Sequence, residues 1–302
     1  MNERELYRSQ VALLIRIMPS VYRIKDFAVH GGTAINLFYR NLPRYSVDID
    51  ITYLPILGRE ESLRNINQHL IEMKKMIERI VPGIKVIHKP EVWKLMCTLS
   101  MATVKIEVNG TKRGVIEPPT DMMLCEKAQQ EFSMGCKARI VSFSQLYGGK
   151  IAAALSRQHP RDLFDCKYME VSDFAQIRKG LILCLLGSDK PIVESLVPNS
   201  IDQTEALEKH FQGMSEVEFS YADYEASRQE LQRWVNNGLT LADKEFLISF
   251  ERGEPDWALC DAGDLSIFPS VQWKLKNILK LKESNPKKFE KGIQLITDLF
   301  SL

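Results

Sequence analysis

The sequence predicts an α+β protein in two parts, a mixed sheet-and-helix half followed by an all-helical half. Residues 47–52 and 103–108 alternate apolar and charged side chains at every second position, which is the period of a strand with one buried face. From Ser144 onward, apolar residues recur at helical spacing in segments separated by prolines. We therefore expect two domains, residues 1–143 and residues 144–302.

In the first half, turn residues separate short segments of regular hydrophobic pattern. Apolar residues at every second position predict strands, and apolar residues three or four positions apart predict helices. The expected helices cover residues 3–19, 33–40 and 59–81, and the expected strands cover 27–30, 47–52, 84–88, 92–101 and 103–108, with two more strands within 115–143. Asn109-Gly110, a pair typical of tight turns, predicts a hairpin after the strand over 103–108.

In the second half, every regular segment has the helical period. The expected helices cover residues 144–158, 161–171, 174–187, 221–237, 240–251, 266–282 and 287–301. Residues 188–220 are the least regular part of the chain and predict an excursion between two helices. The apolar run over 180–187 is too short to span a membrane and predicts a buried helix.

The composition bounds the classes of function. The net charge of +1 favours no nucleic-acid partner by itself, so any RNA contact needs a local basic patch. The six cysteines form no C-x-x-C pair, and the five histidines are scattered without the spacing of zinc ligands. The N-terminal residues lack a signal-peptide pattern, and no apolar run is long enough for a membrane span. We expect a reduced, cytoplasmic protein with no membrane partner.

A glycine turn and an acidic strand lie close together in the first half. The first expected strand ends in Gly31-Gly32, and the helix from Thr33 would point its positive N-terminal end at a phosphate. Asp48 and Asp50, at i and i+2, project from one strand face and can share a metal pair. Taken singly, the acidic face is more often simply solvated and the glycine pair simply a turn. In this order and spacing, they are what nucleotidyl transfer needs.

A third carboxylate, Glu107, is expected on the strand over 103–108, on the side opposite the apolar positions. Magnesium prefers oxygen ligands, so Glu107 is a candidate to join Asp48 and Asp50. The alternative is an exposed strand glutamate that only pairs with its neighbour Lys105.

A second group of charged residues follows the expected domain boundary. Lys150 and Arg157 lie near one face of a helix, and Asp162 and Asp165 occupy the first turns of the next helix. In a functional role, Lys150 binds a triphosphate as a point charge, and one of the two aspartates positions it, contacts the ribose or activates the acceptor. In a structural role, Asp162 caps its helix and Asp165 pairs with Arg161 or Lys150. The sequence leaves both roles open.

These motifs together resemble the polymerase-beta-like nucleotidyltransferase superfamily and, more closely, its AbiEii/AbiGii toxin family, the toxin halves of type IV toxin–antitoxin and phage abortive-infection systems. The motifs are Gly31-Gly32-Thr33-Ala34, Arg44-x-Ser46-x-Asp48-Ile49-Asp50 and Val104-Lys105-Ile106-Glu107-Val108. The segment from Lys150 to Asp165 is similar to the family's second conserved block, and residues 246–257 and 269–277 resemble its C-terminal part. The resemblance covers nearly the whole chain, although its sharp motifs occupy about a fifth of it.

The resemblance implies a polymerase-beta-like nucleotidyltransferase domain followed by a helical domain, and roles for individual residues. Many superfamily members have Gly-Ser where this chain has Gly31-Gly32, so the hydroxyl for phosphate is expected from Thr33 instead. The expected catalytic residues are Asp48, Asp50, Glu107, Lys150 and Asp165, of which Asp48, Asp50 and Glu107 hold the metal. The expected nucleotide-binding residues are Gly31, Gly32, Thr33, Arg44, Ser46, Lys150, Arg157 and Asp162.

The resemblance also implies the reaction and its partners. It implies transfer of a nucleotide from an NTP, with Mg2+ or Mn2+, to a macromolecular acceptor for which tRNA is a candidate. It implies a growth-inhibiting toxin with a separately encoded, DNA-binding antitoxin. Two alternatives stay open: a small-molecule nucleotidyltransferase of the antibiotic-modifying type, and a catalytically silent binding protein of the same fold. The intact Asp48, Asp50 and Glu107 argue against the second.

Overall fold

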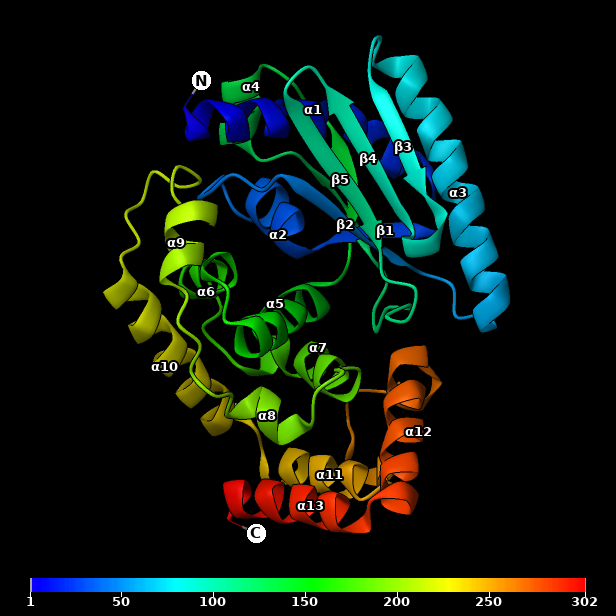
Figure 1. The fold of residues 1–302 in the computed structure, drawn as a ribbon, viewed down its shortest axis with the longest axis vertical. Helices are drawn as coiled ribbons and strands as arrows, with labels where there is room; N and C mark the ends of the chain where they lie inside the picture. The colour runs from blue at the N-terminus through cyan, green and yellow to red at the C-terminus, as the bar shows by residue number, and fades with distance from the viewer. Residues whose placement is uncertain (1, 302) are drawn as a thin grey trace. The chain divides into compact units, whose positions relative to one another are not determined.

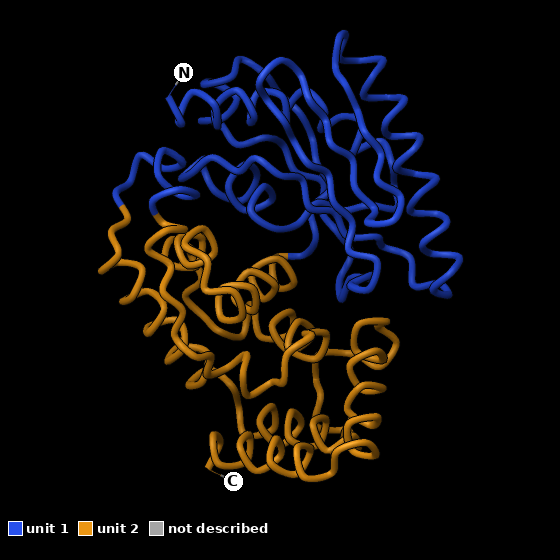
Figure 2. The backbone as a smooth tube through the Cα atoms, viewed as in Figure 1, with its two compact units in different colours: residues 1–142, 208–218 blue, residues 143–207, 219–302 orange. Residues whose placement is uncertain are grey.

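The computed structural model describes residues 2–301, which divide into two compact units (Figure 2). Of these residues, unit 1 contains 2–142 and 208–218, and unit 2 contains 143–207 and 219–301. The division expected from the sequence, after residue 143, assigns the segment 208–218 to the second domain, whereas the structure groups it with unit 1.

Unit 1 is built on a seven-stranded mixed sheet, shown in Figure 1. Its strands are β1 (Phe27–His30), β2 (Asp48–Tyr53), β3 (Lys85–Lys89), β4 (Lys94–Leu99), β5 (Ala102–Val108), β6 (Thr120–Met123) and β7 (Lys137–Ile140). The order across the sheet is β3-β4-β5-β2-β1-β7-β6. The pairs β2–β5 and β1–β7 are parallel, and the other neighbours are antiparallel. The expected mixed sheet is confirmed.

The helices of unit 1 leave the polar side chains of β5 and of the start of β2 partly exposed. They are α1 (Glu3–Arg23), α2 (Gly31–Ala34) with its π-helical continuation η1 (Ile35–Tyr39), α3 (Arg59–Ile80), the short 3-10 turn η2 (Pro90–Val92) and α4 (Glu126–Phe132). The helices α1 and α3 contact each other and strands of the sheet. Every second residue of β5, Val104, Ile106 and Val108, is buried, while Lys105 and Glu107 between them are partly exposed. The apolar face is therefore the covered one, and the acidic face remains accessible.

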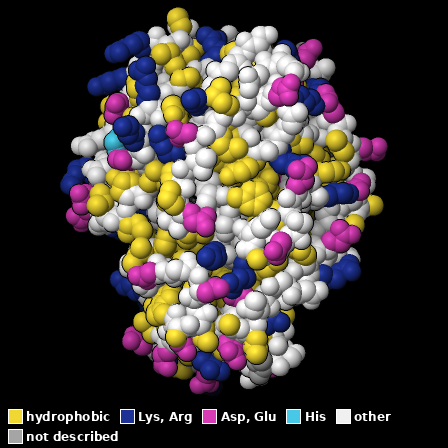
Figure 3. Space-filling view, turned by 180° about the vertical axis from the view of Figure 1, so that it is seen from behind, with side chains coloured by type: hydrophobic (Ala, Val, Ile, Leu, Met, Phe, Trp, Pro, Cys, Tyr) yellow, Lys and Arg dark blue, Asp and Glu magenta, His cyan; other side chains and the backbone are white. Residues whose placement is uncertain are grey.

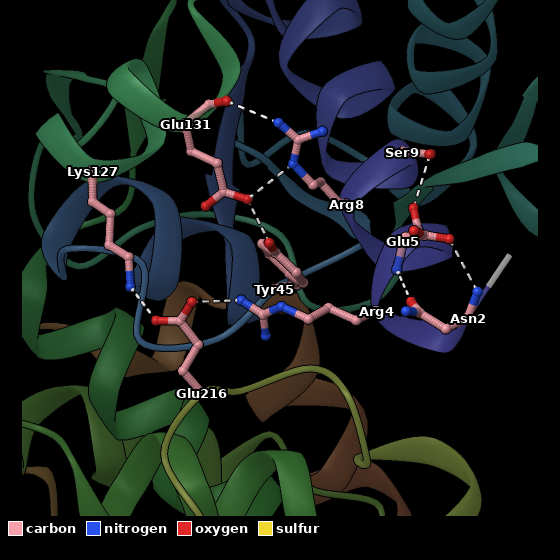
Figure 4. Close-up of polar contacts among 9 residues, drawn as sticks. All are labelled: Asn2, Arg4, Glu5, Arg8, Ser9, Tyr45, Lys127, Glu131 and Glu216. Carbon is pink, nitrogen blue, oxygen red and sulfur yellow. Dashed lines mark hydrogen bonds and ion pairs between the residues drawn. The ribbon is translucent and has the colours of Figure 1, made fainter.

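A capping box begins α1. The Asn2 side chain accepts a hydrogen bond from the backbone N–H of Glu5 at 2.8 Å, and the Glu5 carboxylate accepts from the backbone N–H of Asn2 at 3.1 Å (Figure 4). This arrangement satisfies two N–H groups that the first helical turn leaves without partners.

Unit 2 is helical over its regular parts, as expected. Its helices are α5 (Phe143–Arg157), α6 (Pro160–Lys167), α7 (Ala175–Leu186), α8 (Ile192–Leu196), α9 (Thr204–His210), α10 (Tyr221–Gly238), α11 (Leu241–Glu251), η3 (Trp257–Leu259), η4 (Leu265–Ile267), α12 (Pro269–Ser284) and α13 (Pro286–Phe300), with the end of α9 assigned to unit 1. Two glycines let α5 and α7 pack backbone to backbone: a Cβ on Gly148 would lie 2.2 Å from the Leu181 nitrogen, and one on Gly180 would lie 2.0 Å from the Ser144 carbonyl oxygen.

One local expectation was wrong, and three short helices were not expected. The hairpin at Asn109-Gly110 does not form, because the neighbours of β5 are β4 and β2; the Asn109 side chain instead accepts hydrogen bonds from the backbone N–H groups of Thr111 and Lys112, each at 2.9 Å. The helix α4 was not expected. Within the irregular residues 188–220, the structure forms α8 and α9, which are too short to show a helical period.

The surface matches the near-neutral charge of the sequence. On the face shown in Figure 3, acidic and basic side chains are interspersed among apolar ones. Over residues 2–301, no helix is both long enough and apolar enough to cross a membrane.

Candidate active site

Four neighbouring strands place polar side chains in one row on the accessible face of the sheet. Asp50 of β2 pairs in register with His30 of β1 on one side and with Glu107 of β5 on the other. Glu107 in turn pairs with Lys94 of β4. Residues paired in register project from the same face, so the strand order β4-β5-β2-β1 aligns Lys94, Glu107, Asp50 and His30. The structure thus places Asp50 and Glu107 side by side on one face of the sheet.

A second row lies beside the first, two residues along the strands. Asp48 of β2 pairs in register with Lys105 of β5. Asp48 and Asp50 lie on one face of β2, while Ile49 between them is fully buried on the other. The three carboxylates therefore occupy adjacent positions on two parallel strands.

Two lysines bind the third carboxylate from different strands. The Lys94 Nζ lies 2.7 Å from Glu107 Oε1, and the Lys105 Nζ lies 2.8 Å from Glu107 Oε2. The Lys105 Nζ is also 3.9 Å from Asp48 Oδ2. Burial alone would raise the pKa of Glu107, but the two lysines outweigh it and hold this pKa below its ordinary value. Glu107 is therefore a carboxylate anion between two ammonium groups.

The glycine turn exists because two side chains fill the space that a Cβ would need. Gly31 has φ +72°, and a Cβ built on it would lie 2.7 Å from Asp50 Oδ2. A Cβ on Gly32 would lie 2.7 Å from Arg44 Nη2 and 2.9 Å from Ser46 Oγ. The two glycines thus let the Asp50 carboxylate and the loop before β2 pack directly against the turn.

The three expected nucleotide-binding side chains of unit 1 other than the glycines, Thr33, Arg44 and Ser46, are buried. The Thr33 hydroxyl, expected to face phosphate, is fully buried and donates a hydrogen bond to the Asp48 carbonyl oxygen at 2.5 Å, with Ser46 Oγ 3.0 Å away. Arg44 is 4% exposed, and its Nη1 donates to the Tyr45 carbonyl oxygen at 2.8 Å. In this structure, Thr33, Arg44 and Ser46 join the glycine turn to the start of β2.

A distant segment holds the loop that leads into β2. The Tyr45 backbone N–H donates to the Met214 carbonyl oxygen at 2.7 Å, and Ser215 Oγ donates to the Pro43 carbonyl oxygen at 3.0 Å. Arg44 and Ser215 also form an isolated antiparallel bridge. No pattern in the sequence predicts this pairing, because it joins residues about 170 positions apart through backbone groups.

Ion pairs at the surface of unit 1 anchor the same segment (Figure 4). The Glu216 carboxylate lies 2.7 Å from Arg4 Nη2 of α1 and 3.0 Å from Lys127 Nζ of α4. Beside it, the Tyr45 hydroxyl donates to the Glu131 carboxylate, which also pairs with Arg8 at 3.3 Å. Burial and this hydrogen bond raise the pKa of Tyr45 to about 12.

Unit 2 contains the second expected cluster. The Lys150 Nζ of α5 lies 3.0 Å from Asp162 Oδ1 and 2.8 Å from Asp165 Oδ2, both on α6. All three side chains are buried, whereas Arg157, which lies 2.9 Å from Asp162 Oδ2, is 66% exposed. The structure thus pairs Lys150 with both aspartates, and one of the structural alternatives, the Asp165–Lys150 pair, is present.

Asp162 does not cap its helix. The cap of α6 is His159, whose Nδ1 accepts a hydrogen bond from the backbone N–H of Arg161 at 3.2 Å. Burial would raise the pKa of Asp162, but Lys150 and Arg157 outweigh it and keep this pKa below its ordinary value. The cluster is therefore a charged network inside unit 2.

The donor set of unit 1 suits a hard cation. Asp48, Asp50 and Glu107 offer only carboxylate oxygens, the ligands that Mg2+ and Mn2+ prefer, and the Asp48 and Glu107 side chains are 37% and 31% exposed. As the side chains stand within residues 2–301, no three histidine, cysteine, aspartate or glutamate groups are gathered closely enough to hold a metal ion. For all three carboxylates to bind one cation, the Glu107 carboxylate would have to give up an ion pair with a lysine.

Comparisons with known proteins agree with the fold. The family described as the nucleotidyl transferase AbiEii toxin of type IV TA systems matches residues 13–277. Among solved structures, the nucleotidyltransferase toxin MenT4 from Mycobacterium tuberculosis H37Rv is similar, with a TM-score of 0.60 and 14% identity over 89% of this chain and 92% of that chain. At this identity the likeness shows a shared fold. A comparison with curated proteins gave no match.

Proposed function

Because the chain belongs to the AbiEii family of nucleotidyltransferase toxins from type IV toxin–antitoxin systems, we propose that it transfers a nucleotide from an NTP to an RNA acceptor, with tRNA as the acceptor to test first. The observation that carries the proposal is the set of three carboxylates on the accessible sheet face, beside a glycine turn that Asp50 contacts directly. A phosphate at this turn would meet backbone N–H groups and the N-terminal end of α2 and η1.

The proposed reaction forms one bond and breaks another. A hydroxyl oxygen of the acceptor attacks the α-phosphorus of the NTP, the bond from that phosphorus to the oxygen bridging the β-phosphate breaks, pyrophosphate leaves, and the hydroxyl proton passes to solvent. A divalent cation held by Asp48, Asp50 and Glu107 would supply charge neutralisation for the phosphates. The protein's own task is to hold these carboxylates in place, and Thr33 contributes to it by bonding the backbone of Asp48.

The partners follow from the family. A toxin of a type IV system has a separately encoded antitoxin, and we propose that the antitoxin of this chain binds DNA and that both proteins act in the cytoplasm. We also propose the functional roles expected from the sequence for the charged cluster of unit 2, which consists of Lys150, Arg157, Asp162 and Asp165. In the structure, the two positive and two negative charges of this cluster neutralise one another.

The test is transfer of label from each of the four NTPs, with Mg2+ or Mn2+, to total RNA and to purified tRNA. Wild type should label RNA, and Asp50→Asn should reduce the rate by about 100-fold or more, because a metal ligand is lost. Asp121→Asn, which changes a strand aspartate at the far edge of the same sheet, is the matched control and should leave the rate unchanged.

Two results would contradict the proposal. Label entering small hydroxylated or amino compounds, but not RNA, would assign the chain to small-molecule modification. Absence of transfer from every NTP by folded wild-type protein would show a silent binding protein of the same fold.

A further inference from the structure

Lys94 and Lys105 lie where positive charge works against the proposed metal site. Both ammonium groups contact Glu107, at 2.7 and 2.8 Å, and Lys105 also lies 3.9 Å from Asp48. Their side chains are 29% and 30% exposed, so both ammonium groups can be reached from solvent. Two ammonium groups that compete with a metal ion for the same carboxylate call for a functional explanation.

The balance of charge at the site supplies such an explanation. The three carboxylates and two ammonium groups on this face sum to one negative charge (3 − 2). If Glu107 bound a divalent cation, the local charge would become positive, and the two lysines would lose a carboxylate partner. Each would then present an ammonium group with three N–H donors to an anion.

Exposure distinguishes these lysines from the one expected to bind phosphate. Lys150 is 5% exposed, and its ammonium group already contacts two buried aspartates. Lys94 and Lys105 are about six times more exposed, lie on the accessible sheet face and contact the carboxylates of the site directly. They can reach a ligand in unit 1 without breaking a buried network.

We propose that Lys94 and Lys105 bind the pyrophosphate part of the nucleotide, and that Glu107 holds both side chains in position before the nucleotide arrives. This inference rests on the proposed function, since it names the residues that bind the leaving group of that reaction. It gives Glu107 two successive partners, the lysines first and the cation afterwards. It also predicts that the site prefers nucleoside triphosphates to monophosphates, because only the former carry the group that the lysines bind.

The test measures binding, apart from catalysis. Wild type, Lys94→Met and Lys105→Met are titrated with inorganic pyrophosphate at saturating Mg2+, and separately with Mn2+ alone. Each variant should bind pyrophosphate about tenfold more weakly, the loss expected for one charged hydrogen bond. Mn2+ alone should bind the variants as tightly as wild type or more tightly, because a competing cation is gone. Lys85→Met is the matched control, a lysine on the same face at the far end of the edge strand β3.

The outcomes separate this inference from the function on which it rests. If the lysine variants bind pyrophosphate like wild type, or lose only Mn2+ affinity, the lysines merely orient Glu107 and the inference is wrong. If a separate titration with RNA shows that the variants lose RNA affinity while they keep pyrophosphate affinity, the lysines contact the acceptor and the inference is also wrong. If wild type itself binds no pyrophosphate at saturating metal, the proposed nucleotide site fails with it. Thermal unfolding of each variant, with Lys94→Arg and Lys105→Arg as charge-retaining comparisons, shows that a loss of binding is not a loss of fold.

Discussion

At the scale of single residues, Gly31 controls the position of Asp50. Its φ of +72° and the 2.7 Å between a built Cβ and Asp50 Oδ2 mean that alanine would be strained and would displace the carboxylate. We expect Gly31→Ala to lower the free energy of unfolding by about 1–2 kcal/mol and to reduce nucleotide transfer strongly. Chemical denaturation and the transfer assay measure the two effects.

The control for this change is Gly135→Ala, since nothing lies within 4 Å of a Cβ on Gly135. It should alter neither stability nor transfer measurably. Full activity of Gly31→Ala would show that Asp50 can move from the turn without loss, and the role assigned to the turn would be wrong.

At the scale of helices and strands, Lys150 ties α5 to α6 through two buried carboxylates. Lys150→Met leaves both aspartates without this cation inside unit 2, so we expect a loss of about 3–5 kcal/mol in the free energy of unfolding, measured by urea denaturation. Lys179→Met, on the exposed surface of α7, should change it by less than about 0.5 kcal/mol. A small effect at Lys150 would mean that the aspartates find other partners or water.

Unfolding measured at decreasing pH tests the same ion-pair network of Lys150, Asp162 and Asp165. The folded-state pKa of Asp162 lies below its ordinary value of 3.8, so its contribution to stability is present above about pH 3.8 and is lost as the pH falls through the folded pKa. The free energy of unfolding of wild type should therefore fall in that acid range. It should fall less in Lys150→Met, because this variant already lacks the Lys150–Asp162 ion pair that protonation of Asp162 would break. Equal acid sensitivity of the two proteins would contradict the assignment.

The helices and strands also show what the sequence could predict. Period-two alternation identified β2 and β5 and placed Asp48, Asp50 and Glu107 on exposed faces, because this information is local. It could not show that Asp50 and Glu107 lie in register or that Lys94 joins them, because register is set by pairing between distant strands. The hairpin expected at Asn109 failed for the same reason.

At the scale of the whole molecule, the two compact units are not consecutive pieces of chain, because residues 208–218 belong with unit 1. Met214 in this segment is 3% exposed, whereas Glu216 is 60% exposed in its ion pairs. We expect Met214→Ala to cost about 2–5 kcal/mol and Glu216→Gln less than about 1 kcal/mol, since burial outweighs exposed ion pairs. Met214→Leu, which keeps the volume, is the control.

Hydrogen exchange of the Tyr45 amide reports this effect locally, because that amide donates to the Met214 carbonyl. Its exchange should accelerate in Met214→Ala and stay near the wild-type rate in Glu216→Gln. The reverse order would show that the ion pairs, and not the buried side chain, hold the segment.

The register of β2 and β5 has a consequence for insertions and deletions. One residue added or removed inside β2 would turn Asp50 toward α1 and α3 and bring Ile49 or Ile51 to the accessible face; the same change in β5 would exchange Glu107 for Ile106 or Val108. The connection over residues 109–119 can change length without this effect, because it lies outside both strands. Related sequences that keep the reaction should therefore align without gaps across residues 48–50 and 105–107, however much their loops differ in length.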